Sequence, residues 1–344
     1  MSEFPMNKKT NKRKVLVCGA SGFIGRNIVE KWSGREDMEL YGTYFRTPPR
    51  GSILQNRKIS LLKVDLTSRE QVDELIQGMD VVIQAAAVTT GAKDTITRPY
   101  IHVTDNAVMN SIIFRACFEN QVKHVVFFSC TTMYPSGDGP VKEEDFDYNV
   151  TDKYFGVGWT KVYLEKMCEF YSRIGTTKYT VIRHSNIYGP HDKCDLDRSH
   201  VLGATIAKVI HARDGRIVVW GDGSEARDLL CVSDLVDFVE IILASQQEPF
   251  ELVNLGFGSS IPIKQLVEKV IEISGKNISI EYDRTKPTID FKLTLDVGKA
   301  RKKYGWRPSV PLEEGLRRTL SWYRENLLLS STTQPARQGQ QSVL

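Results

Sequence analysis

A short apolar run, Lys14–Cys18, passes directly into the turn Gly-Ala-Ser-Gly-Phe-Ile-Gly, whose last residue is Gly25. The run has the length of a buried strand, and the segment Ile24–Trp32 that follows has apolar residues at helical spacing. Glycines at this spacing let the backbone turn sharply and approach a pyrophosphate, while a helix N terminus offers free N–H groups and the positive end of a dipole. The order strand, glycine turn, helix therefore predicts a binding site for the diphosphate of a dinucleotide.

The same alternation of apolar runs and amphipathic segments continues through the first half of the chain. Alternating strands and helices are typical of an α/β fold with a parallel sheet that helices cover on both faces. We therefore predict a Rossmann-type doubly wound sheet. Its further strands are expected at Glu39–Phe45, Ile59–Val64, Val81–Gln84, His124–Ser129 and Tyr179–Arg183, and its helices at Arg69–Gly78, Asp105–Asn120 and Val157–Arg173.

Beyond Gly189 the pattern loosens, and loops rich in His, Asp and Gly separate shorter elements. Strands are expected at Ile217–Trp220 and Ile278–Tyr282, and helices at His200–His211, Ile263–Ser274 and Leu312–Glu325. This pattern predicts a smaller substrate-binding lobe that closes over the ends of the sheet. The predicted division is a Rossmann domain of residues 13–186 plus about 226–256, a lobe of about 187–225 plus 257–328, and disordered tails at 1–12 and 329–344.

Composition excludes several classes of protein. The 344 residues are 41% hydrophobic and 26% charged, which is the balance of an ordinary globular chain. The formal net charge is only +4 and charges of both signs are interspersed, so no nucleic-acid partner is predicted. No apolar run approaches the roughly 20 residues of a membrane span, and the polar, lysine-rich N terminus is not a secretory signal. We therefore expect a cytoplasmic protein with no membrane partner.

Six cysteines stand far apart, at positions 18, 117, 130, 168, 194 and 231, and none belongs to a Cys-x-x-Cys pair. Such pairs mark zinc or redox sites, and disulfides are rare in reducing compartments. The spacing therefore predicts reduced thiols and no metal site. Most of these cysteines are expected to be small core residues.

The end of the second predicted strand bears on the choice of cofactor. An acidic residue there would accept a hydrogen bond from the 2′-OH of the adenosine ribose, but the sequence reads Gly42-Thr-Tyr-Phe-Arg46 and contains none. Arg46 instead suits a ribose 2′-phosphate, which favours NADP(H) and leaves NAD(H) possible. The alternative is that Arg46 is a solvated surface residue.

Other residues at strand ends complete the predicted cofactor site. Asp65 and Leu66 follow the third strand, where they would contact the adenine. Asn106 opens the helix after the fourth strand, either as a polar contact that supports this helix or as a helix cap. Small side chains directly after the fourth strand would let the cofactor lie flat against the backbone, and these are Ala85, Ala86 and Ala87.

Together these features resemble the extended short-chain dehydrogenases, the NAD(P)-dependent epimerases, dehydratases and reductases of sugar nucleotides. The spacing Gly-x-x-Gly-x-x-Gly is a variant associated with short-chain dehydrogenases, and the resemblance covers about residues 14–327. Several stretches are most similar to the GDP-L-fucose synthases. These are Ala85–Gly91, Asn186–Asp192, Ser199–Val201, Val219–Asp228, Val253–Gly256, Leu295–Val297 and Tyr304–Pro308.

The resemblance implies roles for individual residues. Lys161 would bind the nicotinamide ribose, and His200 takes the place of the catalytic histidine of the family. Lys208 takes the place of a substrate-binding arginine, while Trp220 and Arg227 match positions that contact the sugar nucleotide. Core packing is the alternative for Trp220, and an ion pair between domains is the alternative for Arg227. The implied contacts of the cofactor diphosphate are Gly19, Ser21, Gly22, Phe23, Ile24 and Gly25, and Asn186 is a further implied substrate contact.

The resemblance also implies partners. The substrate would be a nucleotide-activated sugar, GDP-linked in the subgroup with the most similar motifs. Positively charged side chains in the smaller lobe suit its diphosphate. Related proteins pair through two helices each, which implies a homodimer formed by Asp105–Asn120 and Val157–Arg173.

Three positions depart from the pattern of the family. Cys130 stands where the family has Ser or Thr, and Thr132 stands where the GDP-L-fucose synthases have a catalytic Cys. Position 157, four residues before Lys161, should carry a tyrosine and carries valine. In this chemistry the phenol exchanges a proton with the sugar oxygen while hydride moves, and loss of such a group costs about a hundred- to ten-thousand-fold in rate.

Three other groups could replace the phenol. Tyr154 shares a helix face with position 157 if the helix has already begun there. The thiol of Cys130 could act as an acid beside Lys161, and His200 has a pKa suited to proton transfer near neutrality. Each has a plainer reading, as a surface aromatic, a buried strand-end residue and a sugar or diphosphate contact respectively.

Two functions of different class follow from these residues. The leading prediction is an NADP-dependent epimerase or reductase of a GDP-linked 4-keto sugar, with Cys130, Lys161 and His200 as its catalytic residues. Epimerisation tolerates the loss of the phenol better than reduction does, because it needs only proton shuttling next to a carbonyl. The alternative is a catalytically silent protein that binds the cofactor or the sugar nucleotide as a sensor or partner subunit.

Overall fold

The computed structural model describes residues 12–49, 53, 58–89, 98–193, 199, 201–212, 214–286 and 292–331. Strands and helices alternate through the first half of the chain, as the sequence predicts. The strands of the first half are β1 (Arg13–Cys18), β2 (Met38–Tyr44), β3 (Ile59–Lys63), β4 (Val81–Gln84), β5 (His124–Phe128), β6 (Pro140–Val141), β7 (Lys178–His184) and β8 (Asn186–Tyr188). Those of the second half are β9 (Arg216–Trp220), β10 (Ala226–Cys231), β11 (Phe250–Leu255), β12 (Ser260–Pro262), β13 (Ser279–Asp283) and β14 (Thr294–Leu295).

Each predicted helix is present, with ends that differ by a few residues at most except in α11, and the structure adds α8 and α10. The α-helices are α1 (Phe23–Trp32), α3 (Arg69–Ile76), α5 (Thr104–Glu119), α6 (Phe155–Ile174), α7 (Val201–His211), α8 (Val232–Ser245), α9 (Ile263–Ser274), α10 (Gly298–Tyr304) and α11 (Leu312–Ser331). Three short 3-10 helices precede α5 or α6, namely η1 (Pro99–His102), η2 (Glu143–Asp145) and η3 (Asp152–Tyr154).

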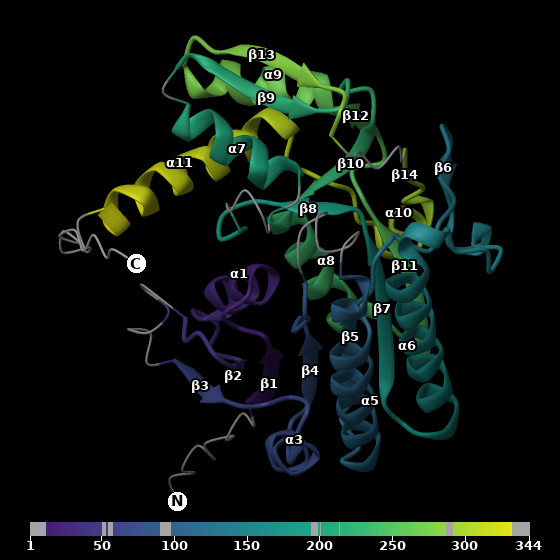
Figure 1. Ribbon diagram of the computed structural model, residues 1–344. Coiled ribbons are helices and arrows are strands. Elements are labelled where there is room, and N and C mark those ends of the chain that lie inside the picture. Colours follow the sequence, from purple (N-terminus) through teal and green to yellow (C-terminus); the bar gives the residue numbers. More distant parts are fainter. Residues whose placement is uncertain are drawn as a thin grey trace, which may run out of the picture.

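Seven parallel strands form the central sheet, in the order β11-β7-β5-β4-β1-β2-β3 (Figure 1). β2 and β3 follow β1 toward one edge of the sheet, and β4, β5, β7 and β11 follow one another toward the opposite edge. This reversal between β1 and β4 is the switch point of a doubly wound sheet, beside which ligands bind at the carboxyl ends of the strands. The predicted Rossmann-type fold is therefore confirmed.

Side chains of β1 alternate between two hydrophobic cores because successive residues of a strand point to opposite faces. Val15 and Val17 pack in the core that contains Trp32 of α1, and Leu16 and Cys18 pack in the other. The first core also contains residues of α8, and the second contains residues of α3, α5 and α6. The sheet is thus covered on both faces, and α5 and α6 lie side by side on one of them (Figure 1).

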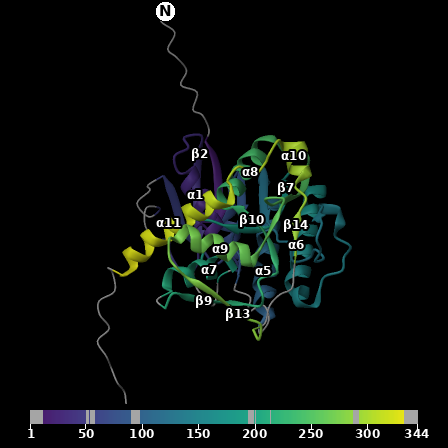
Figure 2. The ribbon, with the colours of Figure 1, turned by 90° about the horizontal axis from the view of Figure 1, so that it is seen from above.

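A smaller group of elements lies above the carboxyl ends of the parallel strands. It contains the three-stranded sheet β12-β10-β8 and the pair β13-β9. Helices α7, α9 and α11 pack against these strands around a third hydrophobic core, and Figure 2 shows the three helices crossing over the central sheet. β10 belongs to this group, while β11 joins the central sheet. The division of the chain into a Rossmann domain and a substrate-binding lobe remains a prediction.

The sequence analysis was wrong in leaving β8, β10, β11 and α8 within irregular chain. β8 has only three residues and exists because it pairs with β10, which a local pattern cannot reveal. α8 is rich in β-branched apolar residues, a composition that favours strands. The predicted start of the C-terminal tail at residue 329 is also wrong, because α11 continues to Ser331 through a run of helix-forming leucines. Within the described chain, no helix combines the length and apolar character needed to cross a bilayer.

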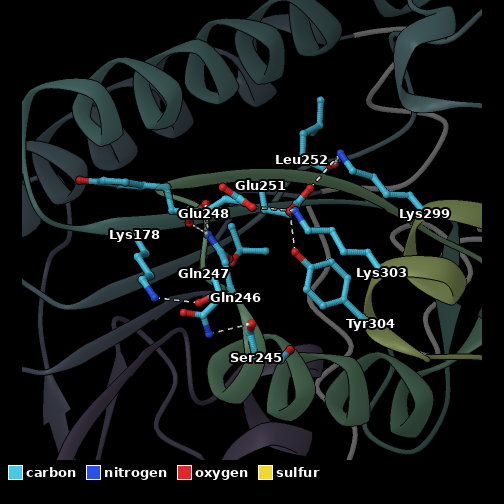
Figure 3. A network of polar contacts seen from close by, with 12 residues as sticks. Lys178, Ser245, Gln246, Gln247, Glu248, Glu251, Leu252, Lys299, Lys303 and Tyr304 are labelled. Atoms are coloured by element: carbon cyan, nitrogen blue, oxygen red, sulfur yellow. Dashed lines mark hydrogen bonds and ion pairs between the residues drawn. The ribbon is translucent and has the colours of Figure 1, made fainter.

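The edge strand β11 is fastened to α10 by a buried carboxylate. Figure 3 shows Glu251 facing Lys299, Lys303 and Tyr304, and the Lys299 ammonium lies 2.9 Å from its carboxylate. The side chain of Glu251 is only 3% exposed, and hydrogen bonds from these partners outweigh burial and lower its pKa. With the bond from the Lys299 ammonium to the Leu252 carbonyl at 2.6 Å, these contacts fasten α10 to the edge strand.

Another buried polar cluster joins β5, β7 and the end of α8, and it leads to a prediction about pH. Nε2 of His124 lies 2.8 Å from Oγ1 of Thr180 and 3.2 Å from Oε1 of Gln246. Burial lowers the pKa of His124 from 6.5 to about 4. Between these two values the unfolded chain binds a proton that the folded chain does not, so the stabilising contribution is present above pH 6.5 and is lost as pH falls toward 4.

We expect the His124→Gln variant to show a shallower fall in stability across this pH window than the wild type. A shift of this size corresponds to about 3 kcal/mol of pH-dependent stability, which urea unfolding at several pH values would measure. His211→Gln is the control because His211 is exposed at the end of α7. Equal slopes for the wild type and His124→Gln would contradict the expectation.

Candidate functional site

The turn between β1 and α1 brings glycine backbone atoms too close together for any side chain. Gly19 has a φ of +80°, and its N–H donates to Oγ1 of Thr43 at 3.0 Å. The N–H of Gly22 donates to the Gly19 carbonyl at 2.9 Å. A Cβ at Gly25 would lie 2.3 Å from that carbonyl oxygen, well inside van der Waals contact. The predicted turn therefore forms as a compact cradle that only glycine can build.

The helix that leaves this cradle has an open N terminus. α1 starts at Phe23 with Gly22 as its N-cap, and no side chain caps it. Phe23 and Ile24 pack against the core of the sheet, and Ser21 is partly buried in the turn. Free N–H groups and the positive end of the helix dipole favour an anion at this point. The residues present thus fit the diphosphate of a dinucleotide, which the strand order also places at the switch point.

The chain leaves β4 directly beside the cradle. A Cβ at Gly19 would lie 2.8 Å from Cα of Ala86, so the two backbones are in contact. Ala85 and Ala86 are partly buried and Ala87 is exposed. Asn106 holds the chain after these alanines, since its side chain accepts from the Val88 N–H at 2.9 Å and donates to the Val88 carbonyl at 3.0 Å.

Asn106 is the third residue of α5, so the helix-cap reading of this residue is wrong. Its amide also donates to the His102 carbonyl at 2.9 Å. These bonds make it the supporting polar contact of the two predicted alternatives. Asn106 therefore shapes the loop that follows β4.

Arg46 lies just beyond the end of β2 and is exposed, with its guanidinium carbon 5.2 Å from the ring centre of Phe45. Asp65 lies across from it, after β3. Hydrogen bonds from Thr67, with a smaller contribution from the Arg46 charge, lower the pKa of Asp65. Leu66 is buried in the core beneath. β2 carries no acidic residue after Glu39, and the Arg46 guanidinium is exposed at its end. This cation can therefore bind a negatively charged ligand.

Lys161 projects from α6 toward the end of β5. Its Nζ donates to the Phe128 carbonyl at 2.9 Å and lies 4.7 Å from the ring centre of Phe127. Burial lowers the pKa of Lys161, and this effect is opposed by the nearby Cys130 thiol and Glu165 carboxylate. The backbone of β5 thus holds the ammonium next to the residue that follows the strand.

Cys130 follows β5, and its Sγ lies 2.9 Å from Oγ1 of Thr132. The thiol interacts electrostatically with Lys161 and also with Tyr154. Tyr154 is the N-cap of α6, one residue before the helix begins. A helix face shared with position 157 would require Tyr154 to lie inside the helix, so that prediction is wrong. The structure nevertheless brings Cys130, Lys161 and Tyr154 together at one strand end.

A buried ion pair supports this strand end from below. The Arg183 guanidinium donates to both carboxylate oxygens of Glu165, with its closest contact at 2.6 Å, and the two side chains are only 4% and 5% exposed. The Ser129 hydroxyl donates to the same carboxylate at 2.5 Å. Ser129 directly precedes Cys130, and Glu165 lies one helical turn after Lys161. Sequence analysis missed this pair because 18 residues separate its members and neither stands in a recognised motif.

The predicted substrate residues fall on the smaller group of elements. Lys208 on α7 donates to the Val218 carbonyl at 2.7 Å, and its ammonium lies 5.9 Å from the ring centre of Trp220. Trp220 is 44% exposed, so the core-packing alternative for this residue is wrong. The charge of Arg227 on β10 reaches Tyr154, which places this arginine near the Cys130 strand end. Asn186 donates to the Asp228 carbonyl at 3.3 Å, alongside the same strand.

His200 lies outside the described residues, and nothing tests its predicted role. The same holds for the end of the stretch Ala85–Gly91 that carries part of the resemblance. The sequence analysis missed one titratable carboxylate, that of Asp192. Burial raises the pKa of Asp192 to about 7, so this residue titrates near neutrality. Asp192 ends the stretch Asn186–Asp192, and its position directly after Gly-Pro-His is the sequence feature that could have singled it out.

Comparison with known proteins agrees with this geometry. The family model described as "NAD dependent epimerase/dehydratase family" matches residues 15–256. GDP-L-fucose synthase of Escherichia coli K12 is 27% identical over 331 residues, covering 92% of this chain and 98% of that protein. GDP-L-colitose synthase of Yersinia pseudotuberculosis is 24% identical over 320 residues, covering 90% and 97% respectively.

Among solved structures, the UDP-glucose 4-epimerase of Thermotoga maritima superposes with a TM-score of 0.80. It is 24% identical in sequence, and the alignment covers 91% of this chain and 99% of that one. At this identity the likeness bears on the fold alone. The family match includes the glycine turn, α6 and β10, and all of β1 except its first two residues.

Proposed function

The chain belongs to the NAD dependent epimerase/dehydratase family, and on that premise we propose that it is an NADP-dependent enzyme that epimerises or reduces a GDP-linked 4-keto sugar. The observation that carries the proposal is the glycine cradle at the switch point of the sheet, where even one methyl group at Gly25 would lie 2.3 Å from a carbonyl oxygen. A turn without side chains lets the diphosphate of a dinucleotide approach the backbone N–H groups directly.

When bound, the nicotinamide cofactor supplies or accepts a hydride. In the proposed site Gly19, Gly22 and Gly25 hold its diphosphate, with Ser21, Phe23 and Ile24 completing the cradle. Lys161 binds the nicotinamide ribose, and Ala85, Ala86 and Ala87 line the path between. The exposed Arg46 supports a ribose 2′-phosphate and hence NADP(H) over NAD(H), and Asp65 and Leu66 lie where the adenine would be bound.

The proposed sugar nucleotide lies over the smaller lobe. Lys208 and Arg227 offer two positive charges for its diphosphate, and the exposed face of Trp220 offers a surface for stacking. Asn186 borders the same strand. The choice of a GDP-linked substrate is supported by the similarity to the fucose and colitose synthases, whose printed names specify GDP-sugars.

The proposed proton chemistry uses Cys130, Lys161 and His200. The thiol of Cys130 and the buried ammonium of Lys161 interact electrostatically. Lys161 is held by the Phe128 carbonyl, so its charge stays at this strand end. Epimerisation next to a carbonyl requires only that protons leave and return at carbon, and a thiol and an imidazole are suited to both steps.

A second function has one observation in its favour. Val157 is partly buried one helical turn before Lys161, where a side chain without polar atoms can neither give nor take a proton. A protein that keeps the cofactor cradle and lacks this phenol fits the role of a silent sensor or partner subunit. The two proposals differ in whether bound substrate is chemically changed.

A single-turnover experiment separates them. The protein is mixed with NADPH and a GDP-linked 4-keto sugar in D₂O, and both the nicotinamide absorbance and deuterium in the sugar are followed. The proposed enzyme is expected to oxidise NADPH or to exchange deuterium into the sugar. Saturable binding of both ligands with neither change would favour the silent protein.

Val157→Tyr tests the same pocket from the opposite direction. If the protein is silent because it lacks this phenol and the pocket is otherwise reductase-like, a phenol placed one turn before Lys161 is expected to raise the rate of NADPH oxidation by about a hundredfold, the lower end of the effect of a positioned acid. Val157→Phe, which adds the ring without the hydroxyl, is the matched control. Equal rates for the tyrosine and phenylalanine variants would contradict the expectation.

We further propose that the protein is a homodimer that pairs through α5 and α6. The two helices pack together, and α6 exposes Tyr163, Phe170 and Ile174 on one side, at helical spacing. Val108 is exposed on α5. Exposed apolar residues gathered on neighbouring helices are typical of an interface.

Phe170→Glu is expected to convert the dimer into a monomer, because it places a charge in the centre of this apolar surface. Size-exclusion chromatography with light scattering would measure the mass. Leu62→Glu is the control, since Leu62 is an exposed apolar residue on β3 at the opposite edge of the sheet. A wild type that is monomeric at micromolar concentration would contradict the pairing.

A further inference from the structure

The missing phenol at position 157 has a neighbour of the same chemistry. Tyr154 is the N-cap of α6, and its N–H donates to the Thr151 carbonyl at 2.9 Å, which fixes its backbone. Its side chain is partly buried and packs beside Cys130 against an apolar cluster that includes Met133, Phe146 and Val162. The ring is therefore held in place by the same cluster that supports the predicted catalytic thiol.

Two glycines let the first turn of α6 pack closely against neighbouring side chains. A Cβ at Gly158 would lie 2.6 Å from Cγ1 of Val150 and 3.6 Å from the Thr132 carbonyl. A Cβ at Gly156 would lie 3.0 Å from Cγ2 of Val103. Side chains at these positions would have to displace Val103 or Val150. The glycines that made a regular helix start uncertain from sequence thus allow close packing around the beginning of α6.

The phenol of Tyr154 is within electrostatic reach of two residues of the site. Burial raises the pKa of the phenol, the Arg227 charge opposes this effect, and the Cys130 thiol adds to it. Cys130 also interacts electrostatically with Lys161. Electrostatic contacts therefore link Tyr154, Cys130, Lys161 and the predicted substrate residue Arg227, which come from three segments: the loop after β5, α6 with its N-cap, and β10.

We propose that Tyr154 is the acid of the reaction and that it does the work of the phenol absent from position 157. This assignment rests on the proposed function. In the reducing direction the O–H bond of Tyr154 breaks and its proton passes to the carbonyl oxygen of the 4-keto sugar, whose π electron pair forms the new O–H bond. The carbonyl carbon accepts the hydride that bound NADPH supplies. Arg227 stabilises the phenolate, which then regains a proton from solvent.

Tyr154→Phe tests the assignment, because it removes one hydroxyl and keeps the ring in the apolar cluster. Tyr148→Phe is the matched control, since Tyr148 is an exposed tyrosine on the same connection. A third variant, Tyr154→Phe with Val157→Tyr, returns a phenol one helical turn further along. For each variant NADPH affinity, melting temperature, single-turnover oxidation and deuterium exchange into the GDP-linked 4-keto sugar are measured.

The expected result is a loss of about a hundred- to ten-thousand-fold in the single-turnover rate of Tyr154→Phe, with NADPH affinity and melting temperature unchanged. Tyr148→Phe should match the wild type, and the double variant should recover part of the rate. A rate of Tyr154→Phe equal to that of the wild type would overturn the assignment and leave the proposed function standing. A wild type that binds both ligands but neither oxidises NADPH nor exchanges deuterium would overturn the proposed function and the assignment with it.

Discussion

Gly25→Ala is expected to abolish dinucleotide binding. The added Cβ would lie 2.3 Å from the Gly19 carbonyl oxygen and 2.8 Å from the carbonyl carbon, and both are backbone atoms that cannot rotate away. Either the turn must open or α1 must shift, and each change moves the N–H groups that the diphosphate needs. A loss of at least about a hundredfold in affinity follows if these hydrogen bonds and the dipole interaction are lost together. Titration with NADPH would measure it.

The glycines of this region provide graded controls. A Cβ at Gly22 would lie 3.2 Å from the Gly19 carbonyl, so Gly22→Ala should weaken binding less than Gly25→Ala. A Cβ at Gly34, just after α1, meets nothing within 4 Å, so Gly34→Ala should bind NADPH like the wild type. Circular dichroism would verify that each variant is folded. Normal affinity in a folded Gly25→Ala variant would show that the cradle is not the binding site.

Arg183→Met is expected to destabilise the protein by about 3–5 kcal/mol, because it leaves the Glu165 carboxylate buried without its cation. The two side chains are almost fully enclosed, and Arg183 also donates to the Tyr134 hydroxyl at 2.9 Å. Methionine fills most of the volume of the arginine stem, so the loss reports on charge more than on a cavity. Urea unfolding followed by circular dichroism would measure the free energy of unfolding.

Arg173→Met is the matched control for this prediction. Arg173 pairs with Glu169 on the same helix as Glu165, but the arginine is 72% exposed. Exposed pairs contribute about 0–1 kcal/mol, so this variant should unfold close to the wild type. Replacing Glu165 by Leu together with Arg183→Met should recover much of the stability, because no unpaired charge then remains. Equal effects of the buried and exposed substitutions would contradict the argument.

The cradle could be predicted from sequence because everything it needs is local. Lys14–Cys18, the three glycines and the following helix are consecutive in the chain, and their order determines the turn. The central sheet could be predicted for a similar reason, since alternating strands and helices allow few arrangements. Lys161 could be placed on a helix next to a strand end by its position in the family pattern.

The parts that could not be predicted depend on distant partners. β8 is a strand because it pairs with β10, although 37 residues lie between Tyr188 and Ala226, and β10 pairs with both β8 and β12. Glu165 and Arg183 have no local pattern that distinguishes them from surface charges. The packing around the start of α6, where Tyr154 lies, depends on Gly156 and Gly158, whose missing side chains leave room for Val103 and Val150. Helical spacing does not capture this effect.

The most direct test of a pyridine nucleotide site at the carboxyl ends of β1 and β4 is an equilibrium titration of the purified protein with NADPH, followed by nicotinamide fluorescence. One saturable site per chain is expected. NADH should bind more weakly than NADPH, because the strand end expected to face the adenosine ribose carries Arg46 and no acidic side chain. Failure of both nucleotides to bind a folded sample would contradict the central claim that the glycine cradle is a dinucleotide site.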